Sequence, residues 1–227
     1  MGPNVLLLGH RGCSGNKAVP ENTLAAFDLA LQKGCDGFEF DVRLTGCGRA
    51  VVCHDVKIAG VTVSKATRTQ LLELARLEDI ILRYEKECFL NIELKVKGLE
   101  AKLLTLLRDR LPRCGYVVSS FLPEVLFEIK ARRDGVPVGI ICKTASQLGK
   151  WRMLPVDYVI VHKSLVTRAL VEEVHDTGCK IFVWTVKQAK VMRQFAAWDV
   201  DGIISDDIEL LAKTFGRERA PSLRNVN

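Results

Sequence analysis

The chain has 227 residues, of which 48% are hydrophobic and 26% charged, a balance typical of a soluble globular protein and unlike a disordered or fibrous one. Its 33 lysines and arginines against 27 acidic residues give a net charge of +6, but the basic residues are scattered, which argues against a nucleic-acid-binding stripe. Small basic clusters at Lys130–Arg133 and Arg217–Arg224 leave open only a weak contact with an anionic membrane surface.

Neither membrane insertion nor export is indicated by the sequence. No apolar run reaches roughly 18 residues, and Val5–Leu8 lacks the flanks of a signal peptide. The eight cysteines form no C-x-x-C pair and do not cluster with the four histidines as zinc ligands do. We therefore expect mostly buried cysteines in a reducing, cytoplasmic location, while the oligomeric state is left undetermined.

Short apolar runs rich in β-branched residues alternate with segments of helical periodicity, which predicts a parallel sheet. In chain order, the predicted strands are Val5–Gly9, Gly37–Val42, Ala50–His54, Phe89–Lys95, Tyr116–Ser120, Pro137–Cys142, Tyr158–Val161, Ile181–Thr185 and Gly202–Ser205. The predicted helices are Glu21–Lys33, Thr69–Lys86 (continuous or broken), Leu99–Arg110, Pro123–Arg133, Ala145–Arg152, Leu165–Thr177, Lys187–Ala196 and Asp207–Phe215.

One connection is too short for a parallel crossover. Only about seven residues separate Val42 from Ala50, whereas a crossover needs a dozen or more, so these strands should form a hairpin. Without the return strand, eight β/α units remain, the number that closes a (β/α)₈ TIM barrel. We expect a single barrel domain over residues 1–215 and a flexible tail over residues 216–227.

Carboxylates gather where such a barrel holds its catalytic groups, at the carboxyl ends of the strands. Glu39 and Asp41 share one face of the second strand, and Glu93 has the same placement on the next barrel strand. Unpaired carboxylates at one mouth would be costly to desolvate. A divalent cation resolves that cost, and salt bridges to arginine or lysine are the alternative. Oxygen ligands favour Mg²⁺ or Ca²⁺ over zinc, without choosing between these two.

Two histidines should reach the same mouth. His10 follows the first strand and His54 ends the hairpin's return strand, so one imidazole can remove a proton from the attacking hydroxyl while the other protonates the leaving alkoxide. Lys95, on the same face as Glu93, adds a positive charge that suits an anionic substrate such as a phosphodiester. His162 and His175 lack such neighbours.

Taken together, these residues give the chain a resemblance to the glycerophosphodiester phosphodiesterase family. The similarity runs from residue 10 to residue 206 through eight segments, which occur in the family order. They are His10-Arg11-Gly12, Pro20-Glu21-Asn22-Thr23, Glu39-x-Asp41-Val42-x-Leu44-Thr45, His54-Asp55, Asn91-Ile92-Glu93-Leu94-Lys95, Ser119-Ser120-Phe121, Trp184-Thr185-Val186 and Asp201-Gly202-Ile203-Ile204-Ser205-Asp206.

The resemblance implies roles for the matching positions. They are an acid/base pair at His10 and His54, divalent-metal ligands at Glu39, Asp41 and Glu93, phosphate contacts at Arg11 and Lys95, and aromatic pocket walls at Phe121 and Trp184. It also implies a reaction in which a glycerophosphodiester yields sn-glycerol 3-phosphate and an alcohol. The attacking group is either water or a hydroxyl of the substrate itself.

The sequence departs from the family after the His54-Asp55 pair. Many members carry a substantial capping insertion there, whereas here only residues 56–67 precede the next helical segment. An uncapped mouth would admit lysophospholipids as well as small diesters. Lys187 stands where family members often have asparagine. A non-catalytic phosphodiester-binding barrel is the alternative from another class, but it predicts the loss of at least one catalytic position, and none is lost.

Overall fold

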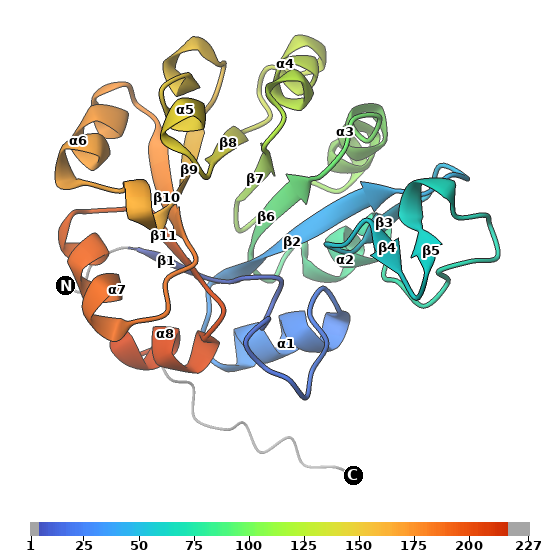
Figure 1. The fold of residues 1–227 in the computed structure, drawn as a ribbon, viewed down its shortest axis with the longest axis horizontal. Helices are drawn as coiled ribbons and strands as arrows, with labels where there is room; N and C mark the ends of the chain where they lie inside the picture. The colour runs from blue at the N-terminus through green and yellow to red at the C-terminus, as the bar shows by residue number, and fades with distance from the viewer. Residues whose placement is uncertain (1–4, 218–227) are drawn as a thin grey trace.

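The structure, a computed structural model, describes residues 5–217, and its centre is a closed barrel of parallel strands (Figure 1). The barrel strands are β1 (Leu6–Gly9), β2 (Gly37–Leu44), β6 (Phe89–Leu94), β7 (Tyr116–Ser120), β8 (Val138–Cys142), β9 (Tyr158–His162), β10 (Lys180–Trp184) and β11 (Gly202–Ser205). Each pairs with its neighbours in chain order, and β1 pairs with both β2 and β11, which closes the ring. The predicted TIM barrel is confirmed.

Helices surround the barrel and connect successive strands (Figure 1). They are α1 (Leu24–Gln32), α2 (Leu77–Tyr84), α3 (Glu100–Asp109), α4 (Pro123–Arg132), α5 (Ala145–Leu148), α6 (Arg168–Asp176), α7 (Ala189–Ala197) and α8 (Ile208–Thr214). None of the helices within residues 5–217 combines the length and apolar character needed to cross a membrane.

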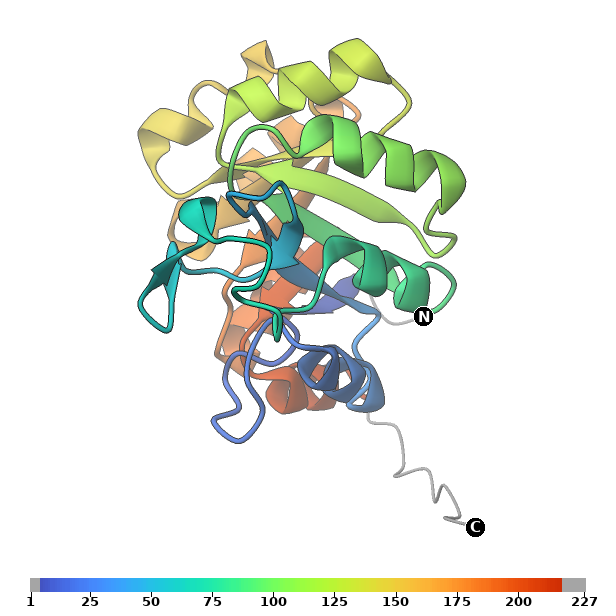
Figure 2. The ribbon, with the colours of Figure 1, turned by 90° about the vertical axis from the view of Figure 1, so that its right-hand side faces the viewer.

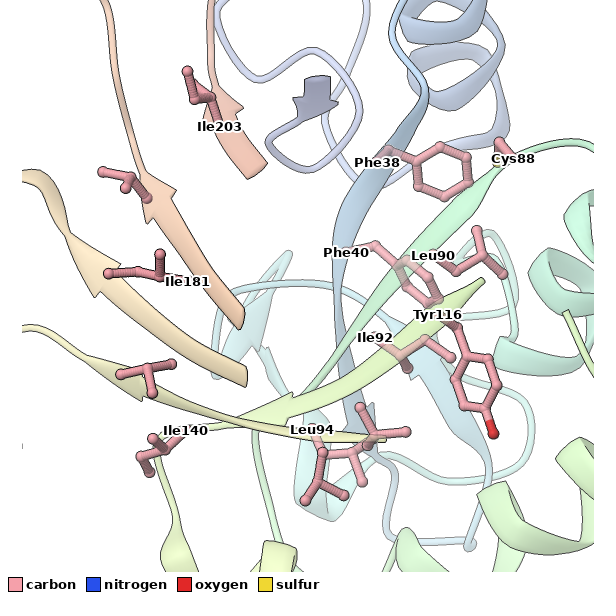
Figure 3. Packing of buried hydrophobic residues seen from close by; sticks show 14 of the residues in the cluster. Phe38, Phe40, Cys88, Leu90, Ile92, Leu94, Tyr116, Ile140, Ile181 and Ile203 are labelled. Carbon is pink, nitrogen blue, oxygen red and sulfur yellow. The ribbon is translucent and has the colours of Figure 1, made fainter. Parts of the chain in front are cut away.

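The strand period of two divides the core into an outer and an inner layer. Outward-facing side chains such as Phe38 and Phe40 on β2 belong to the outer layer (Figure 3). They pack against the helices, and the ring of Phe38 stacks on that of Phe27 of α1 with the centroids 4.2 Å apart. The inner layer fills the barrel with side chains such as Leu8 and Phe182. Gly202 makes room for this filling, because a Cβ atom there would lie 2.6 Å from the Phe182 ring. The packed interior leaves the carboxyl ends of the strands as the place for a site.

The predicted hairpin is present and carries a segment that the sequence did not reveal. β3 (Ala50–Val52) runs antiparallel to the end of β2, and residues 53–76 then project beside the barrel (Figure 2). They contain the small hairpin of β4 (Lys57–Ile58) and β5 (Val61–Thr62), which has its own apolar cluster around Val63 and Leu71. We call residues 53–76 the side segment.

Several predicted helices are shorter than expected, and the reason is visible at three of them. The helix predicted over residues 69–86 begins only at Leu77, because Arg49 binds the carbonyl oxygens of Gln70 and Leu71 and Val51 pairs with Arg76, which fixes this stretch outside helical geometry. α1 begins after Thr23, whose hydroxyl accepts a hydrogen bond from the Ala26 amide. The helix predicted over 145–152 stops at 148, before Gly149.

The structure agrees with the prediction that most of the cysteines are buried. Five of the eight cysteines are buried, and all eight are free; the buried ones are Cys13, Cys35, Cys53, Cys88 and Cys142.

The predicted tail over residues 216–227 lies mostly outside the described residues. Its described part includes Arg217, whose guanidinium pairs with Asp36 and donates to the carbonyl of Val5, so this residue is anchored to the barrel.

Candidate active site

Three acidic side chains meet on the inner face of β2 and β6. The parallel register places Glu39 opposite Asn91 and Asp41 opposite Glu93, so the carboxylates of two neighbouring strands share one end of the barrel. One oxygen from each of Glu39, Asp41 and Glu93 lies within 4.8 Å of the others, and all three residues are buried. The sequence therefore placed this triad correctly from strand periodicity alone.

Cations neutralise this triad only in part. Lys95 Nζ lies 2.7 Å from Glu93 Oε1 and 3.2 Å from Asp41 Oδ1, while Arg11 Nε lies 3.3 Å from Asp41 Oδ2. Burial opposes the ionisation of Asp41, yet Lys95 and Arg11 hold its pKa below the ordinary value. Burial and the neighbouring carboxylates raise the pKa of Glu39 well above its usual range and that of Glu93 to about 7. The salt bridges predicted as the alternative thus exist for Asp41 and Glu93, whereas within residues 5–217 no lysine or arginine side chain forms one with Glu39.

The donor set fits a divalent cation. Within the described residues, Glu39 Oε1 is buried without any hydrogen-bond partner, although its other oxygen accepts a hydrogen bond from the Arg11 amide at 3.0 Å. A buried carboxylate oxygen without a partner is costly, and a bound cation removes that cost. Three carboxylates also match the oxygen ligands that Mg²⁺ and Ca²⁺ prefer.

His10 reaches the triad from the end of β1. Its Nδ1 lies 2.5 Å from Asp206 Oδ1, so this nitrogen carries the proton that the carboxylate accepts. Its Nε2 lies on the opposite side of the ring, 3.8 Å from Glu39 Oε2. Lys187 Nζ contacts the second Asp206 oxygen at 2.5 Å, and the Ser14 hydroxyl donates to the first at 2.6 Å. The imidazole is thereby held with Nε2 toward the carboxylates.

His54 is placed by the hairpin rather than by a barrel strand. It follows β3, and its carbonyl oxygen accepts a hydrogen bond from Arg43 Nε at 2.8 Å. Its Nδ1 lies 2.9 Å from Asp55 Oδ1, and the side chain is 37% exposed against 18% for His10. The two histidines thus have the same kind of carboxylate partner at Nδ1 but differ in solvent access.

These residues line a cavity of about 340 Å³ at the carboxyl end of the barrel, a volume that suits a small molecule. Its lining consists of His10, Arg11, Glu39, His54, Asn91, Glu93, Lys95, Phe121, Ile141, Lys143, Ile160, Trp184 and Ile204. Asp41 lies just behind the lining, bonded to its neighbours. Phe121 and Trp184 meet edge to face at 6.0 Å and form one wall. The structure therefore brings every predicted site residue together.

Comparison with known proteins agrees with this geometry. The pattern of the Glycerophosphoryl diester phosphodiesterase family matches residues 10–89 and 89–210, nearly the whole described chain. The chain belongs to this family. A glycerophosphodiester phosphodiesterase of Caldanaerobacter subterraneus is 32% identical over 91% of this chain and 96% of its own length. The family and the predicted enzyme class are thus confirmed.

Solved structures of similar proteins have the same fold. A glycerophosphodiester phosphodiesterase from Thermotoga maritima is 27% identical, with a TM-score of 0.78 over 92% of this chain and 97% of that one. A phosphodiesterase from Oleispira antarctica, in complex with the product sn-glycerol-3-phosphate, is 24% identical, with a TM-score of 0.81 over 93% of this chain and 96% of that one.

Two polar residues stand in the segments that resemble the family, but neither of them was assigned a role in the site from the sequence. Asp206, which pairs with His10, follows the last barrel strand and lies two residues after Ile204, whose side chain lines the cavity. Because side chains alternate along a strand, this spacing of two residues could have indicated that Asp206 faces the cavity as well. Asn22 has its backbone at φ +59° and forms two hydrogen bonds with Asp41. The Asn22 Nδ2 donates to Asp41 Oδ2 at 2.9 Å, and the backbone amide of Asp41 donates to Asn22 Oδ1 at 3.2 Å. No periodic pattern marks a loop residue of this kind.

Proposed function

We propose that this glycerophosphodiester phosphodiesterase family member hydrolyses glycerophosphodiesters to sn-glycerol 3-phosphate and an alcohol, by metal-dependent catalysis with two histidines. The observation that carries the proposal is the buried triad of Glu39, Asp41 and Glu93, whose two glutamates line one cavity with His10 and His54. The named activity of the Caldanaerobacter relative and the bound product of the Oleispira structure support the choice of substrate.

The side chains divide the chemistry between them. The triad would hold a Mg²⁺ or Ca²⁺ ion, which when bound neutralises charge on the nonbridging phosphate oxygens. Lys95 and Arg11 add fixed positive charge beside the same phosphate. His10 and His54 exchange protons with the attacking hydroxyl and the leaving alkoxide through their Nε2 atoms, since each Nδ1 is taken by an aspartate.

The test is a product assay with defined metals. Glycerophosphocholine is incubated with the protein in Mg²⁺, in Ca²⁺ and in EDTA, and sn-glycerol 3-phosphate and choline are measured separately. Release of both products in at least one metal, with none in EDTA, is the expected result. Absence of cleavage of glycerophosphocholine, glycerophosphoethanolamine and glycerophosphoglycerol in every metal would refute the proposal.

A second candidate function, cleavage of lysophospholipids at the phosphodiester bond, rests on a groove beside the cavity. This groove of about 550 Å³ runs between the start of α1 and the side segment and shares His54 with the active cavity. Its wall includes Leu24, Ile58 and Leu74, and Leu24 is itself 36% exposed. In the described chain, no residue of the side segment apart from His54 lines the cavity itself, so an acyl chain has an open route from it.

The two substrates can be separated with one pair of variants. Leu24→Gln in the groove should lower kcat/KM for lysophosphatidylcholine and leave glycerophosphocholine unaffected, because only the lipid reaches the groove. Leu82→Gln, at a leucine that is 56% exposed on α2, is the matched control and should change neither. Equal rates of Leu24→Gln and wild type on the lysolipid would remove the groove from the proposal.

A further inference from the structure

Asn91 places an unpaired hydrogen-bond donor on the floor of the active cavity. The residue lies on β6 with 1% of its surface exposed, and it belongs to the cavity lining. Its Oδ1 accepts a hydrogen bond from the Ser119 hydroxyl at 2.7 Å. Its Nδ2 has no partner anywhere in residues 5–217. Buried donors are almost always paired in proteins, so an unpaired one at a cavity surface indicates a missing acceptor.

Ser119 fixes which way the amide faces. It is fully buried on β7, behind the cavity surface, and its register partner on β6 is Glu93. Because its hydroxyl holds the oxygen of the Asn91 amide, the NH₂ group is directed away from Ser119. The donor is thus oriented before any ligand arrives, which lowers the entropy that binding would cost.

The position of Asn91 along β6 indicates which part of a substrate it meets. It precedes Glu93 by two residues and pairs with Glu39, so it lies one layer deeper in the barrel than the Asp41–Glu93 pair. Lys95 and Arg11, the cations suited to a phosphate, both contact carboxylates of that upper layer. The same cavity lining includes the apolar side chains of Ile160 and Ile204. A neutral donor at this depth suits a neutral oxygen beyond the phosphate.

We propose that Asn91 donates a hydrogen bond from Nδ2 to a hydroxyl of the substrate's glycerol moiety and so determines specificity for glycerol, with Ser119 as the positioning residue. The proposal rests on the proposed function, since it assigns a part of that same substrate. It predicts that hydroxylated and deoxygenated ligands are distinguished at this one side chain.

The test compares two phosphate monoesters by calorimetry, so that it does not depend on turnover. sn-Glycerol 3-phosphate and propyl phosphate, which lacks both free hydroxyls, are titrated into wild type and Asn91→Ala in the presence of Mg²⁺. Loss of one hydrogen bond, with desolvation of the group left behind, should raise the Kd of sn-glycerol 3-phosphate roughly 5- to 100-fold. The Kd of propyl phosphate should stay within about twofold, because the substitution leaves its contacts intact.

Matched serine variants test the positioning role. Ser119→Ala should weaken only sn-glycerol 3-phosphate, by less than Asn91→Ala does. Ser120→Ala, at an equally buried serine whose hydroxyl bonds the Leu94 carbonyl instead, should weaken neither ligand. Asn91→Leu keeps the branched shape and the number of side-chain heavy atoms while removing the donor, and it serves if the alanine variant does not fold.

Equal weakening of both ligands in the Asn91 variants would overturn the proposal in favour of a contact with the phosphate or a purely structural role. Equal affinity of wild type for the two ligands would overturn it as well. Failure of the proposed function looks different: wild type would then cleave no glycerophosphodiester, whatever its affinities for the two monoesters.

Discussion

His10 and Asp206 form a hydrogen-bonded pair across the seam where β1 and β11 close the barrel, with Nδ1 2.5 Å from Oδ1. The two residues are 196 positions apart in the chain, and the parallel register that matches Gly9 to Ser205 brings them together. The first and last strands therefore hold one hydrogen-bonded unit, in which the carboxylate selects the tautomer and orientation of the imidazole.

This pairing predicts a large effect of Asp206→Asn on turnover. The amide can no longer hold the proton of Nδ1 in the same way, so kcat should fall roughly 10- to 1,000-fold while KM changes little. Lys187→Gln removes only the contact to the other Asp206 oxygen and should lower kcat by less than Asp206→Asn does. Steady-state kinetics on glycerophosphocholine check this, and a rise in KM alone would contradict it.

The same carboxylate predicts how stability depends on pH. Burial opposes its ionisation, but hydrogen bonds from His10, Lys187 and Ser14 hold the pKa of Asp206 well below its ordinary value. An acid whose pKa is lower in the folded state stabilises the fold above its unfolded pKa, near 4, and this contribution is lost as the pH falls further. The difference in Tm between wild type and Asp206→Asn should thus narrow below about pH 4. A constant difference down to about pH 3 would contradict this sign.

Removal of either histidine should abolish most activity without unfolding the protein. General acid and base catalysis each contribute on the order of 10²–10⁴ in rate, so His10→Ala and His54→Ala should lower kcat by such factors. His175→Ala is the matched control, because His175 also pairs with an aspartate, Asp201, at 2.9 Å, but lies outside the cavity. Circular dichroism verifies the fold. Near-wild-type turnover by either active-site variant would disprove the assignment.

Metal binding should be visible as thermal stabilisation. At a cation concentration of about 100 times Kd, binding adds about 2.7 kcal/mol, which for a chain of this size raises Tm by roughly 5–10 °C. Glu39→Gln should lose this shift. Glu85→Gln, at a buried glutamate paired with Arg110, should keep it. A full shift in Glu39→Gln would exclude Glu39 as a ligand.

In the absence of metal, Glu39→Gln should not lower the melting temperature of the protein. Burial and the carboxylates of Asp41 and Glu93 raise the pKa of Glu39, which means that its ionised form costs folding energy near neutral pH. Glu39→Gln should therefore melt in EDTA at a temperature equal to or above that of wild type. A clearly lower Tm would show that Glu39 stabilises the fold without metal.

The sequence predicted the barrel and the carboxylates because both depend on local periodicity. The alternation in β2 and β6 alone placed Glu39, Asp41 and Glu93 on one face, and the short link after Leu44 required a hairpin. Residues 69–76 were predicted as the start of a helix because their composition suits one. Arg49 instead binds the carbonyl oxygens of Gln70 and Leu71, and these contacts lie 21 and 22 residues away in the chain, where no local window of sequence displays them. The unpaired Asn91 amide was hidden for the same reason, since it depends on Ser119.

A backbone hydrogen bond holds the two ends of the side segment together, and this affects how the substrate specificity of the enzyme can change. The Val52 amide bonds the Ala75 carbonyl at 2.8 Å, so the segment leaves and rejoins the barrel at almost one point. A loop with fixed, adjacent ends changes length at small entropic cost. Lengthening, shortening or exchange of residues 56–74 would therefore remodel the groove while the strands carrying the triad keep their register. Exchange of the side segment can therefore change which substrates the enzyme accepts while the residues of the triad stay the same.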